Sequence, residues 1–373
     1  MQRIRHAPRA DWRKRAEDLD FSFHTIDGEP YWVEDAAYQF TAQEIDTIED
    51  ATGELEQLCL ALVERTIESG AYEPFHLEPG AIELIEASWR NGHRNLYGRF
   101  DLSYAQGKPP KLLEYNADTP TSLYEASVVQ WEWLETVFPD ADQFNSIHEK
   151  LIEAWRGMGL AKSAVHFSCV REHDEDRGTV DYLRDTAMQA GHETEFLFVD
   201  EIGWNGRDFV DAGDKPIATL FKLYPWEWLM REEFARNIPR SQAQFIEPAW
   251  KMLLANKAIL PLLWKLAPDH PNLLEAAFEP SAIDGAVAAK PILGREGANI
   301  RLSKGGQTLA RASGPYGDEP FVYQRLAPLP VFDGNHALVG AWVVASKPAG
   351  LGMREDSGPI TTNASRFVPH LFR

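Results

Sequence analysis

Hydrophobic and polar residues alternate in two neighbouring stretches early in the chain, residues 98–101 and residues 112–116. Such alternation is typical of β-strands. The segment between them, residues 104–110, contains one glycine and two prolines, which indicates a turn. We therefore predict a β-hairpin. Because side chains two positions apart share one face of a strand, Glu114 and Asn116 are expected to point the same way.

Apolar residues that recur every three or four positions predict helices. The clearest repeat covers residues 42–70, with Thr41 in front of it as a candidate N-cap. A helix over residues 119–137 is expected to begin at Thr119-Pro120-Thr121, since proline is favoured in a first turn. Its free N–H groups would then lie beside the hairpin. Other helices are predicted over residues 12–19, 80–90, 142–158, 178–190 and 249–266.

Short apolar runs predict buried strands at residues 164–170, 195–199 and 218–223. A helix between the first two strands indicates a parallel α/β unit. Ligands of open α/β sheets bind beyond the carboxyl ends of the strands. The charged segment 171–177 and the segment 224–228, where an acid stands among aromatic residues, are therefore candidate substrate sites; a solvated loop and ordinary packing are the alternatives. Further strands are predicted at residues 287–293, 321–324 and 338–344.

Composition narrows the class of protein. The chain has 373 residues, 44% apolar and 25% charged, which is typical of a globular protein of two or three domains or one large composite domain. No apolar run reaches the roughly 18 residues of a membrane span, and the N-terminus lacks the apolar core of a secretory signal. We therefore expect a cytoplasmic protein without a membrane partner.

The net charge of −20 disfavours nucleic-acid binding, which needs a basic surface. Clustered acids would attract a cationic substrate such as a polyamine, although simple solubility explains most of these charges. The two cysteines, Cys59 and Cys169, have apolar neighbours and are expected to be buried. They predict neither a disulfide framework nor a cysteine metal site.

The predicted hairpin carries candidate chemistry. Pairing of its strands would bring Asp101 close to Glu114 and Asn116. Two carboxylates and an amide oxygen form the hard ligand set that Mg2+ prefers when it also binds phosphates. Arg99 would share their face and could bind a phosphate or an anionic transition state. An exposed hairpin with ordinary surface charges explains these residues equally well.

Two lysines and a glycine-bounded loop complete this group. Lys257 is predicted on a helix and Lys290 on a strand, and lysines bind phosphates as point charges. The loop 294–300 has neither the glycine spacing nor the following helix of a Walker or Rossmann motif, but a mobile loop could close over a nucleotide. The chain has no Ser-His-Asp elbow, paired Cys-His signature or HExxH motif.

Six short blocks resemble the synthetase domain of glutathionylspermidine synthases, and especially the stand-alone proteins similar to that domain. They are GRFD (98–101), LLEYNADTPTSL (112–123), FKLYPWEW (221–228), NKAILPLLW (256–264), KPILGREG (290–297) and ITTNASRFVPH (360–370). The resemblance implies an α/β fold of the circularly permuted ATP-grasp type with an inserted parallel α/β subdomain. We accordingly expect residues 1–160 to carry the metal hairpin, 161–245 to bind substrate, and 246–373 to bind nucleotide.

The resemblance also implies a reaction and its residues. ATP, with Mg2+, would phosphorylate the carboxylate of a peptide or amino acid, and an amine, such as a polyamine, would attack the acyl phosphate to form an amide. Arg99 would be the transition-state arginine, and the magnesium ligands would be Asp101, Glu114 and Asn116. Nucleotide contacts would come from Arg99, Lys257, Lys290, Arg295, Glu296, Gly297 and Gln324. Substrate contacts would come from Thr119, Ser122, Glu175, Thr179 and Glu227.

Two alternatives stay open. The chain could bind ATP without ligase turnover, as a regulatory or partner-binding protein, or it could be a small-molecule kinase. The bifunctional members of the family carry a cysteine amidase domain, and we expect none in residues 1–40. Substrate identity does not follow from the resemblance, because function depends on the site and not on the fold; oligomeric state does not follow either.

Overall fold

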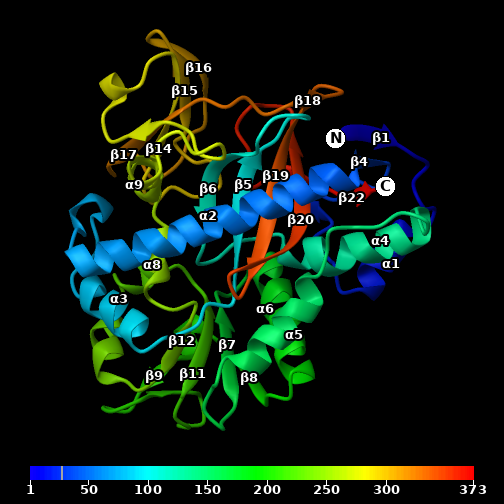
Figure 1. The fold of residues 1–373 in the computed structure, drawn as a ribbon. Coiled ribbons are helices and arrows are strands. Elements are labelled where there is room, and N and C mark those ends of the chain that lie inside the picture. The colour runs from blue at the N-terminus through cyan, green and yellow to red at the C-terminus, as the bar shows by residue number, and fades with distance from the viewer. Residues whose placement is uncertain (27) are drawn as a thin grey trace.

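The computed structural model describes residues 1–26 and 28–373. Its central sheet has the strand order β21-β20-β19-β5-β6, with β18 paired to β19 (Figure 1). The predicted hairpin supplies β5 and β6, which pair antiparallel, and the C-terminal part of the chain supplies the remaining strands. The strands are β5 (Tyr97–Ser103), β6 (Lys111–Asn116), β18 (Val331–Phe332), β19 (Asn335–Val344), β20 (Lys347–Asp356) and β21 (Arg366–Val368).

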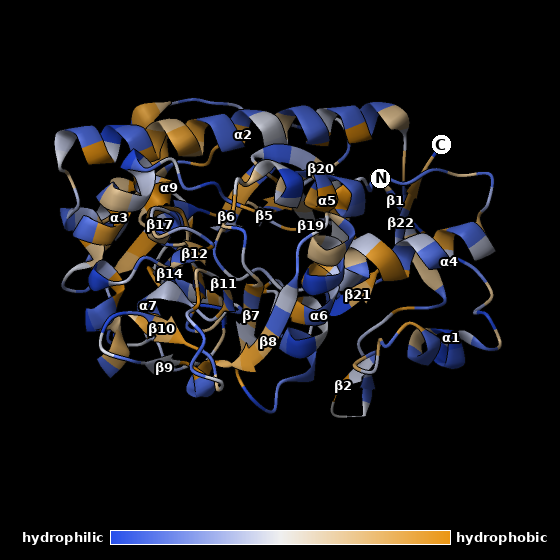
Figure 2. Cartoon of the chain, turned by 90° about the horizontal axis from the view of Figure 1, so that it is seen from below, coloured by the Kyte–Doolittle hydropathy of each residue, from blue (hydrophilic) through white to orange (hydrophobic). Residues whose placement is uncertain are grey.

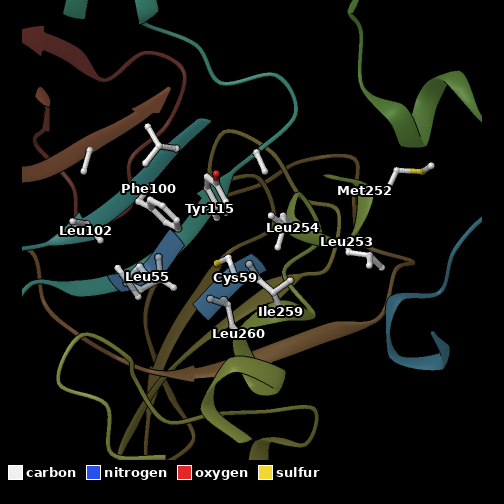
Figure 3. Close-up of a cluster of buried hydrophobic side chains, with 14 of the residues drawn as sticks. Leu55, Cys59, Phe100, Leu102, Tyr115, Met252, Leu253, Leu254, Ile259 and Leu260 are labelled. Atoms are coloured by element: carbon white, nitrogen blue, oxygen red, sulfur yellow. The ribbon is translucent and has the colours of Figure 1, made fainter. Parts of the chain in front are cut away.

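The long helix α2 (Ala42–Ser69) crosses this sheet, as Figure 1 shows. A capping box between Thr41 and Glu44 begins the helix, and Gly70 ends it in a left-handed conformation. Hydrophobic and hydrophilic segments alternate along α2 (Figure 2), as expected for a helix with one buried face. In Figure 3, its Leu55 and Cys59 belong to one buried cluster with side chains of β5, β6 and the two short helices α8 (Lys251–Leu254) and α9 (Ile259–Leu266).

A separate four-stranded parallel sheet has the order β12-β11-β7-β8. It confirms the predicted parallel α/β unit, because β7 pairs in parallel with both β8 and β11. Helices α5 (Ile147–Gly157) and α6 (Asp174–Gln189) cover one face through a shared apolar cluster. The strands are β7 (Val165–Cys169), β8 (Thr194–Phe198), β11 (Thr219–Leu223) and β12 (Gln244–Ile246).

A third sheet, with the order β13-β17-β14-β15-β16, is antiparallel, and α9 packs on β13 and β17. It contains β13 (Ala276–Ala277), β14 (Ala286–Pro291), β15 (Arg301–Lys304), β16 (Gln307–Arg311) and β17 (Phe321–Arg325). Near the chain ends, β1 (Gln2–Arg5), β4 (Ala36–Phe40) and β22 (His370–Phe372) form a small sheet, so both ends lie together in Figure 1.

The remaining elements are short. They are α1 (Trp12–Asp18), β2 (Thr25–Ile26), β3 (Glu29–Pro30), α3 (Ala81–Arg90), α4 (Gln130–Val137), β9 (Gly203–Trp204), β10 (Phe209–Val210), α7 (Trp226–Leu229), α8 (Lys251–Leu254) and α9 (Ile259–Leu266), with one-turn or 3-10 helices at Glu73–Phe75, Val199–Glu201, Glu233–Arg240 and Pro280–Ala282. Cys59 and Cys169 are both buried and free, as predicted. Among the described residues, no helix is long and apolar enough to cross a membrane.

Two helix predictions were wrong at places that matter for the site. The helix predicted from Thr119 begins only after Ser122, whose φ of 67° is left-handed, and its first part, Glu125–Val129, is a π-helix. The helix predicted over 249–266 is two helices, α8 and α9. Asn256 lies in the break between them, where its side chain binds the carbonyl of Phe75 and the N–H of Ala258.

Two helix boundaries and one strand also differ from prediction. Helix α5 begins at Ile147 instead of residue 142, and α6 begins at Asp174 instead of residue 178. Most of the charged segment 171–177 is therefore the first turn of α6, where three acidic residues suit the positive end of the helix dipole. Strand β20 was not predicted at all, because residues 350–356 were interpreted only as a polar segment.

Candidate active site

The register of the hairpin brings its predicted site residues together. Asp101 of β5 lies opposite Glu114 of β6, and Arg99 lies opposite Asn116. On the other side, β19 approaches β5 closely at Gly340, where a Cβ atom would come within 2.9 Å of the Arg99 side chain. The glycine at this position therefore leaves space for the aliphatic part of the Arg99 side chain.

Arg99 and Asp101 form a buried, bidentate ion pair. The Nε and Nη2 atoms of Arg99 donate to the two carboxylate oxygens of Asp101 at 2.7 and 3.1 Å. Nη1 donates to the carbonyl of Thr121 at 2.5 Å, and the guanidinium lies 5.7 Å from the ring centre of Trp342. Burial raises the pKa of Asp101, although Arg99 opposes this shift. The guanidinium is thus fixed in place by three separate groups.

Glu114 faces the predicted lysines. The Nζ atom of Lys257 lies 3.1 Å from Glu114 Oε2, and Asn116 Nδ2 lies 3.5 Å from Oε1. Burial acts to raise the pKa of Glu114, but Lys257 and Lys290 outweigh it and bring the pKa to about 2. Lys257 also donates to the carbonyl of Gly294 at 2.5 Å, so it links the hairpin to the glycine-bounded loop.

Lys290 of β14 is buried beside this pair. Its Nζ donates to Gln324 Oε1 at 2.8 Å and to the carbonyl of Leu113 at 2.7 Å. Burial lowers the pKa of Lys290 to about 8, even though Glu114 acts to raise it. Gln324 in turn donates to the carbonyl of Leu112 at 2.9 Å. The two predicted nucleotide residues Lys290 and Gln324 are therefore fixed to each other and to β6.

A cavity opens over these residues and is bounded by the hairpin, the third sheet and the segment 359–361. Its polar lining is Asp101, Glu114, Lys290, Arg325, Gln324 and Thr361, and its apolar lining includes Leu113, Ala288, Ile300, Leu302, Leu329 and Leu338. The cavity is thus apolar on much of its surface and charged where the hairpin contributes.

The loop 294–300 reaches the cavity through Gly297. Its φ is 71°, and a Cβ atom there would lie 2.3 Å from the carbonyl oxygen of Thr361, so only glycine fits. The Arg295 side chain contacts residues that do not line the cavity. Its Nε donates to Glu227 at 2.9 Å and its Nη1 to Thr119 Oγ1 at 2.7 Å. The structure therefore joins two predicted substrate residues through a predicted nucleotide residue. Glu296 is exposed.

Ser122 lies in a second buried cluster. Its hydroxyl is 2.9 Å from the hydroxyl of Tyr31 and accepts from Arg354 Nη1 at 3.3 Å. Glu175, in the first turn of α6, is buried, and burial raises its pKa while Arg354 lowers it. Thr179 is buried one turn further along α6. No described contact places Thr179 in this cluster, and its assignment stays a prediction.

Arg354 and Glu125 were not predicted. Arg354 of β20 donates to the carbonyl of Ser365 at 2.8 and 3.0 Å, which orients it toward Ser122. Burial and the charge of Glu175 raise the pKa of Glu125 to about 7, with Tyr31 donating to one of its oxygens at 2.5 Å. The alternation in residues 347–356 would have placed Arg354 on a strand; nothing in the sequence singles out Glu125.

The metal prediction is compatible with the geometry but untested. Within residues 1–26 and 28–373, no group of three or more His, Cys, Asp or Glu side chains is arranged to bind a metal ion. The predicted set has only two carboxylates, and Arg99 already pairs with one of them. Magnesium commonly uses one or two carboxylates and completes its shell with water and phosphate oxygens. The donor set therefore fits magnesium together with a phosphate ligand.

Comparisons with known proteins agree with this arrangement. At the level of the fold, the chain is similar to a glutathione synthetase-like effector from Globodera pallida, with a TM-score of 0.58 and 11% identity over 97% of this chain and 96% of that one. This likeness supports a mixed α/β fold. The profile described as "Glutathionylspermidine synthase preATP-grasp" matches residues 3–373. The chain belongs to the glutathionylspermidine synthase family.

Individual relatives define its place more closely. A Haemophilus influenzae protein named "Putative acid--amine ligase" is 45% identical over 392 aligned positions that cover 100% of both chains. The trypanothione synthetase of Crithidia fasciculata is 31% identical over 75% of this chain, and the bifunctional glutathionylspermidine synthetase/amidase of Escherichia coli is 29% identical over 76%. The chain matches about half of each of the last two proteins, 48% and 51%.

Proposed function

We propose that the chain is an ATP- and Mg2+-dependent acid–amine ligase, which joins the carboxylate of a peptide or amino acid to an amine. One observation carries the proposal: buried carboxylates and lysine ammonium groups meet at one cavity. Asp101, Glu114 and Lys290 line it, and Lys257 pairs with Glu114 at 3.1 Å. The names of the relatives, a ligase and several synthetases, support the same class of reaction.

The residues fit a magnesium nucleotide. The apolar lining suits a purine base, and the two lysines suit its phosphates. Asp101, Glu114 and Asn116 would provide the magnesium ligands. The ion would compete with Arg99 for Asp101, so the Arg99 guanidinium would turn, at least in part, toward the phosphates. When bound, ATP supplies the phosphoryl group that activates the acid.

The reaction needs little covalent chemistry from the protein. The carboxylate oxygen takes the terminal phosphoryl group and ADP leaves; the amine nitrogen then attacks the acyl carbon, phosphate leaves with the electron pair of the broken C–O bond, and the amine loses a proton. Arg99 would stabilise charge on the transferring group, as a preorganised cation in a water-poor site. Lys257 and Lys290 would position the phosphates, and the loop around Gly297 would exclude water.

The second cluster supports an amine as the other substrate. Glu125, Glu175 and Asp176 are carboxyl groups withdrawn from solvent, and burial raises the pKa of each one, to about 7 for Glu125 and about 6 for Asp176. A cationic amine, such as a polyamine, would stabilise their ionised forms. Thr119, Ser122, Glu175, Thr179 and Glu227 remain proposed as substrate contacts.

The finer description of the fold belongs to the same proposal. We assign a circularly permuted ATP-grasp fold with an inserted parallel α/β subdomain, divided at residues 1–160, 161–245 and 246–373. The central sheet supports a permuted order, since β5 pairs with β19 although more than two hundred residues separate them in sequence. The division itself stays a prediction.

An ADP-release screen over carboxylates and amines, with mass spectrometry of the products, tests the proposed function. We expect ADP to form only when both substrates are present, and the product to have the mass of acid plus amine minus water. A phosphorylated product that forms without an amine would instead establish a small-molecule kinase. ATP binding without turnover across the screen would establish a nucleotide-binding protein without ligase activity.

A further inference from the structure

A second cavity, of about 400 Å3, lies on the parallel sheet. It opens on the face that α5 and α6 leave uncovered, because it is lined by Ser168 of β7 and by Leu220 and Lys222 of β11, whereas Phe167 and Phe221 point toward those helices. Among the described residues, no lining residue is shared with the cavity over Asp101 and Glu114. None of the residues assigned above to metal, nucleotide or substrate contacts lines it, but Arg171 and Tyr224 belong to the two segments, 171–177 and 224–228, that the sequence predicted as candidate substrate sites.

The cavity lies where such sheets commonly bind ligands. The first strand, β7, is central, with β8 on one side and β11 on the other, so the strand order reverses direction between β7 and β11. Open parallel sheets bind ligands beyond the carboxyl ends of the strands at this point. Here Ser168 and Lys222 stand near those ends, and Leu229 of α7 and Phe234 of the segment after it also line the cavity.

The interior of the cavity is apolar and its one charge is neutralised. Phe209, Leu220 and Phe245 are buried lining residues. Lys222 donates to Asp118 at 2.8 Å and to the carbonyl of Tyr224 at 2.9 Å, so a carboxylate already compensates its ammonium group. This interior would therefore bind the apolar part of a ligand.

The mouth of the cavity carries excess negative charge. Asp200 and Glu232 both line it. In the described part of the chain, Arg171 is the one cationic lining residue besides Lys222, and it already donates to Asp200 at 2.9 Å and to Glu201 at 2.7 Å. Glu232 accepts only from the hydroxyl of Tyr224 among the described contacts, at 2.7 Å. Three carboxylates against one guanidinium favour a cation at the mouth.

The walls of the cavity are also adjacent along the chain to both partners of Arg295. Glu227, which accepts from Arg295, belongs to α7, and Leu229 of the same helix lines the cavity. Thr119, the other partner, follows Asp118, which pairs with Lys222 on the cavity side. A molecule that orders this wall would therefore also order the anchors of the loop around Gly297.

We propose that this cavity binds a small amine with an apolar body, and that its occupancy is coupled to the loop 294–300 through α7 and the Lys222–Asp118 pair. The amine nitrogen would lie at the mouth between Asp200 and Glu232. The binding of the amine does not depend on the ligase proposal. The expected effect of the amine on the affinity for ATP rests on that proposal.

Calorimetry on the full chain without nucleotide tests the binding, with phenethylamine as the probe and hydrocinnamate as an anion of similar body. We expect the amine to bind and the acid to bind about threefold to tenfold more weakly. The double variant Asp200→Asn/Glu232→Gln should weaken the amine by a similar factor. Glu233→Gln is the matched control: it is exposed, pairs with Arg236 and does not line the cavity.

The results that would overturn the proposal are equally specific. They are no heat with either probe, equal affinity for amine and acid, or an amine affinity that falls in Asp101→Asn but not in the mouth variant, which would place the amine in the ligase site. Leu220→Trp should fill the cavity and abolish binding; if it does not fold, the mouth variants still decide, because their side chains are exposed.

The coupling is measured as the dissociation constant of ATP with and without saturating phenethylamine. A change of roughly fivefold or more is expected in the wild type and none in the mouth variant at the same amine concentration. An unchanged constant in the wild type would overturn the coupling. Failure of the ligase screen would leave the calorimetric result unaffected, so the two proposals fail separately.

Discussion

The two halves of the candidate active site are built differently. The strand half, Arg99, Asp101, Glu114 and Lys290, stands on paired strands, and its side chains are bound to one another or to neighbouring carbonyls. The loop half, residues 294–300, stands on no regular element, and its contacts to the rest of the site include those of Gly294, Arg295 and Gly297. The difference suggests that charge is preorganised on the strands while access is controlled by the loop.

The largest effect is expected from the carboxylates of the strand half. Asp101→Asn and Glu114→Gln keep the shape of the side chains but remove the charge that a metal needs, so ADP release should fall by about a thousandfold or more. Asp101→Asn should also lower the free energy of unfolding by about 3 kcal/mol, because it leaves the Arg99 guanidinium buried without its counter-ion. Steady-state assays and urea titrations measure the two effects.

These variants have a matched control in Glu56→Gln. Glu56 is also fully buried, and it accepts from Tyr115 on the far side of β6. Its loss should reduce stability without a specific loss of turnover per folded molecule. Near-normal turnover in Asp101→Asn or Glu114→Gln would show that the hairpin carboxylates take no part in the reaction.

Arg99→Lys tests the second member of the strand half. Lysine keeps the positive charge but cannot form the two parallel bonds to Asp101. We expect turnover to fall by about a hundredfold to a thousandfold while the dissociation constant of ATP changes much less, as for a group that acts in the transition state. Arg9→Lys, at another largely buried arginine that pairs with Glu34 and Glu132, is the control. Equal losses in binding and turnover would contradict the role.

The strand half was the part that the sequence could predict. Alternation located β5 and β6, and the expected pairing of the two strands brought Asp101 close to Glu114; both proved right, because register follows from local pattern. Lys257 was also a candidate from the sequence, but its position depends on a helix break at Asn256 that periodicity missed. The second cluster escaped prediction, because the bonds of Glu125 to Tyr31 and of Arg354 to Ser365 depend on tertiary contacts that no local pattern encodes.

Glu125 offers a test of that second cluster through pH. Burial, followed by the charge of Glu175, raises its pKa from 4.5 to about 7. Between these values the folded protein binds the proton and the unfolded chain does not, so the free energy of unfolding falls as pH rises through this window. Glu125→Gln mimics the protonated acid and should therefore be more stable than the wild type at pH 8, by up to about 3 kcal/mol, and about equally stable at pH 4.

Urea titrations at the two pH values measure this difference, and Glu135→Gln, on the exposed side of α4, is the control that should change stability by less than about 0.5 kcal/mol at both. If Glu125→Gln has the same advantage at both pH values, the carboxyl group does not titrate with folding. The cluster would then not be expected to bind an amine through ionised carboxylates.

The smallest expected effect comes from a glycine of the loop half, where the loss of a close contact can be distinguished from ordinary backbone strain. Gly297 and Gly305 both have positive φ, 71° and 56°, but a Cβ atom at Gly297 would lie 2.3 Å from the carbonyl oxygen of Thr361, whereas none lies within 4 Å at Gly305. Alanine should therefore cost about 1 kcal/mol of stability at Gly305, and more at Gly297, where the close contact adds to the conformational penalty. Only Gly297→Ala should also displace the loop from the cavity and weaken ATP by about tenfold, measured as its dissociation constant. The two variants share the conformational penalty and differ in the contact alone. Equal ATP affinities would therefore show that the loop does not close the nucleotide site. Access to the site would then have to be controlled by the contacts of Arg295.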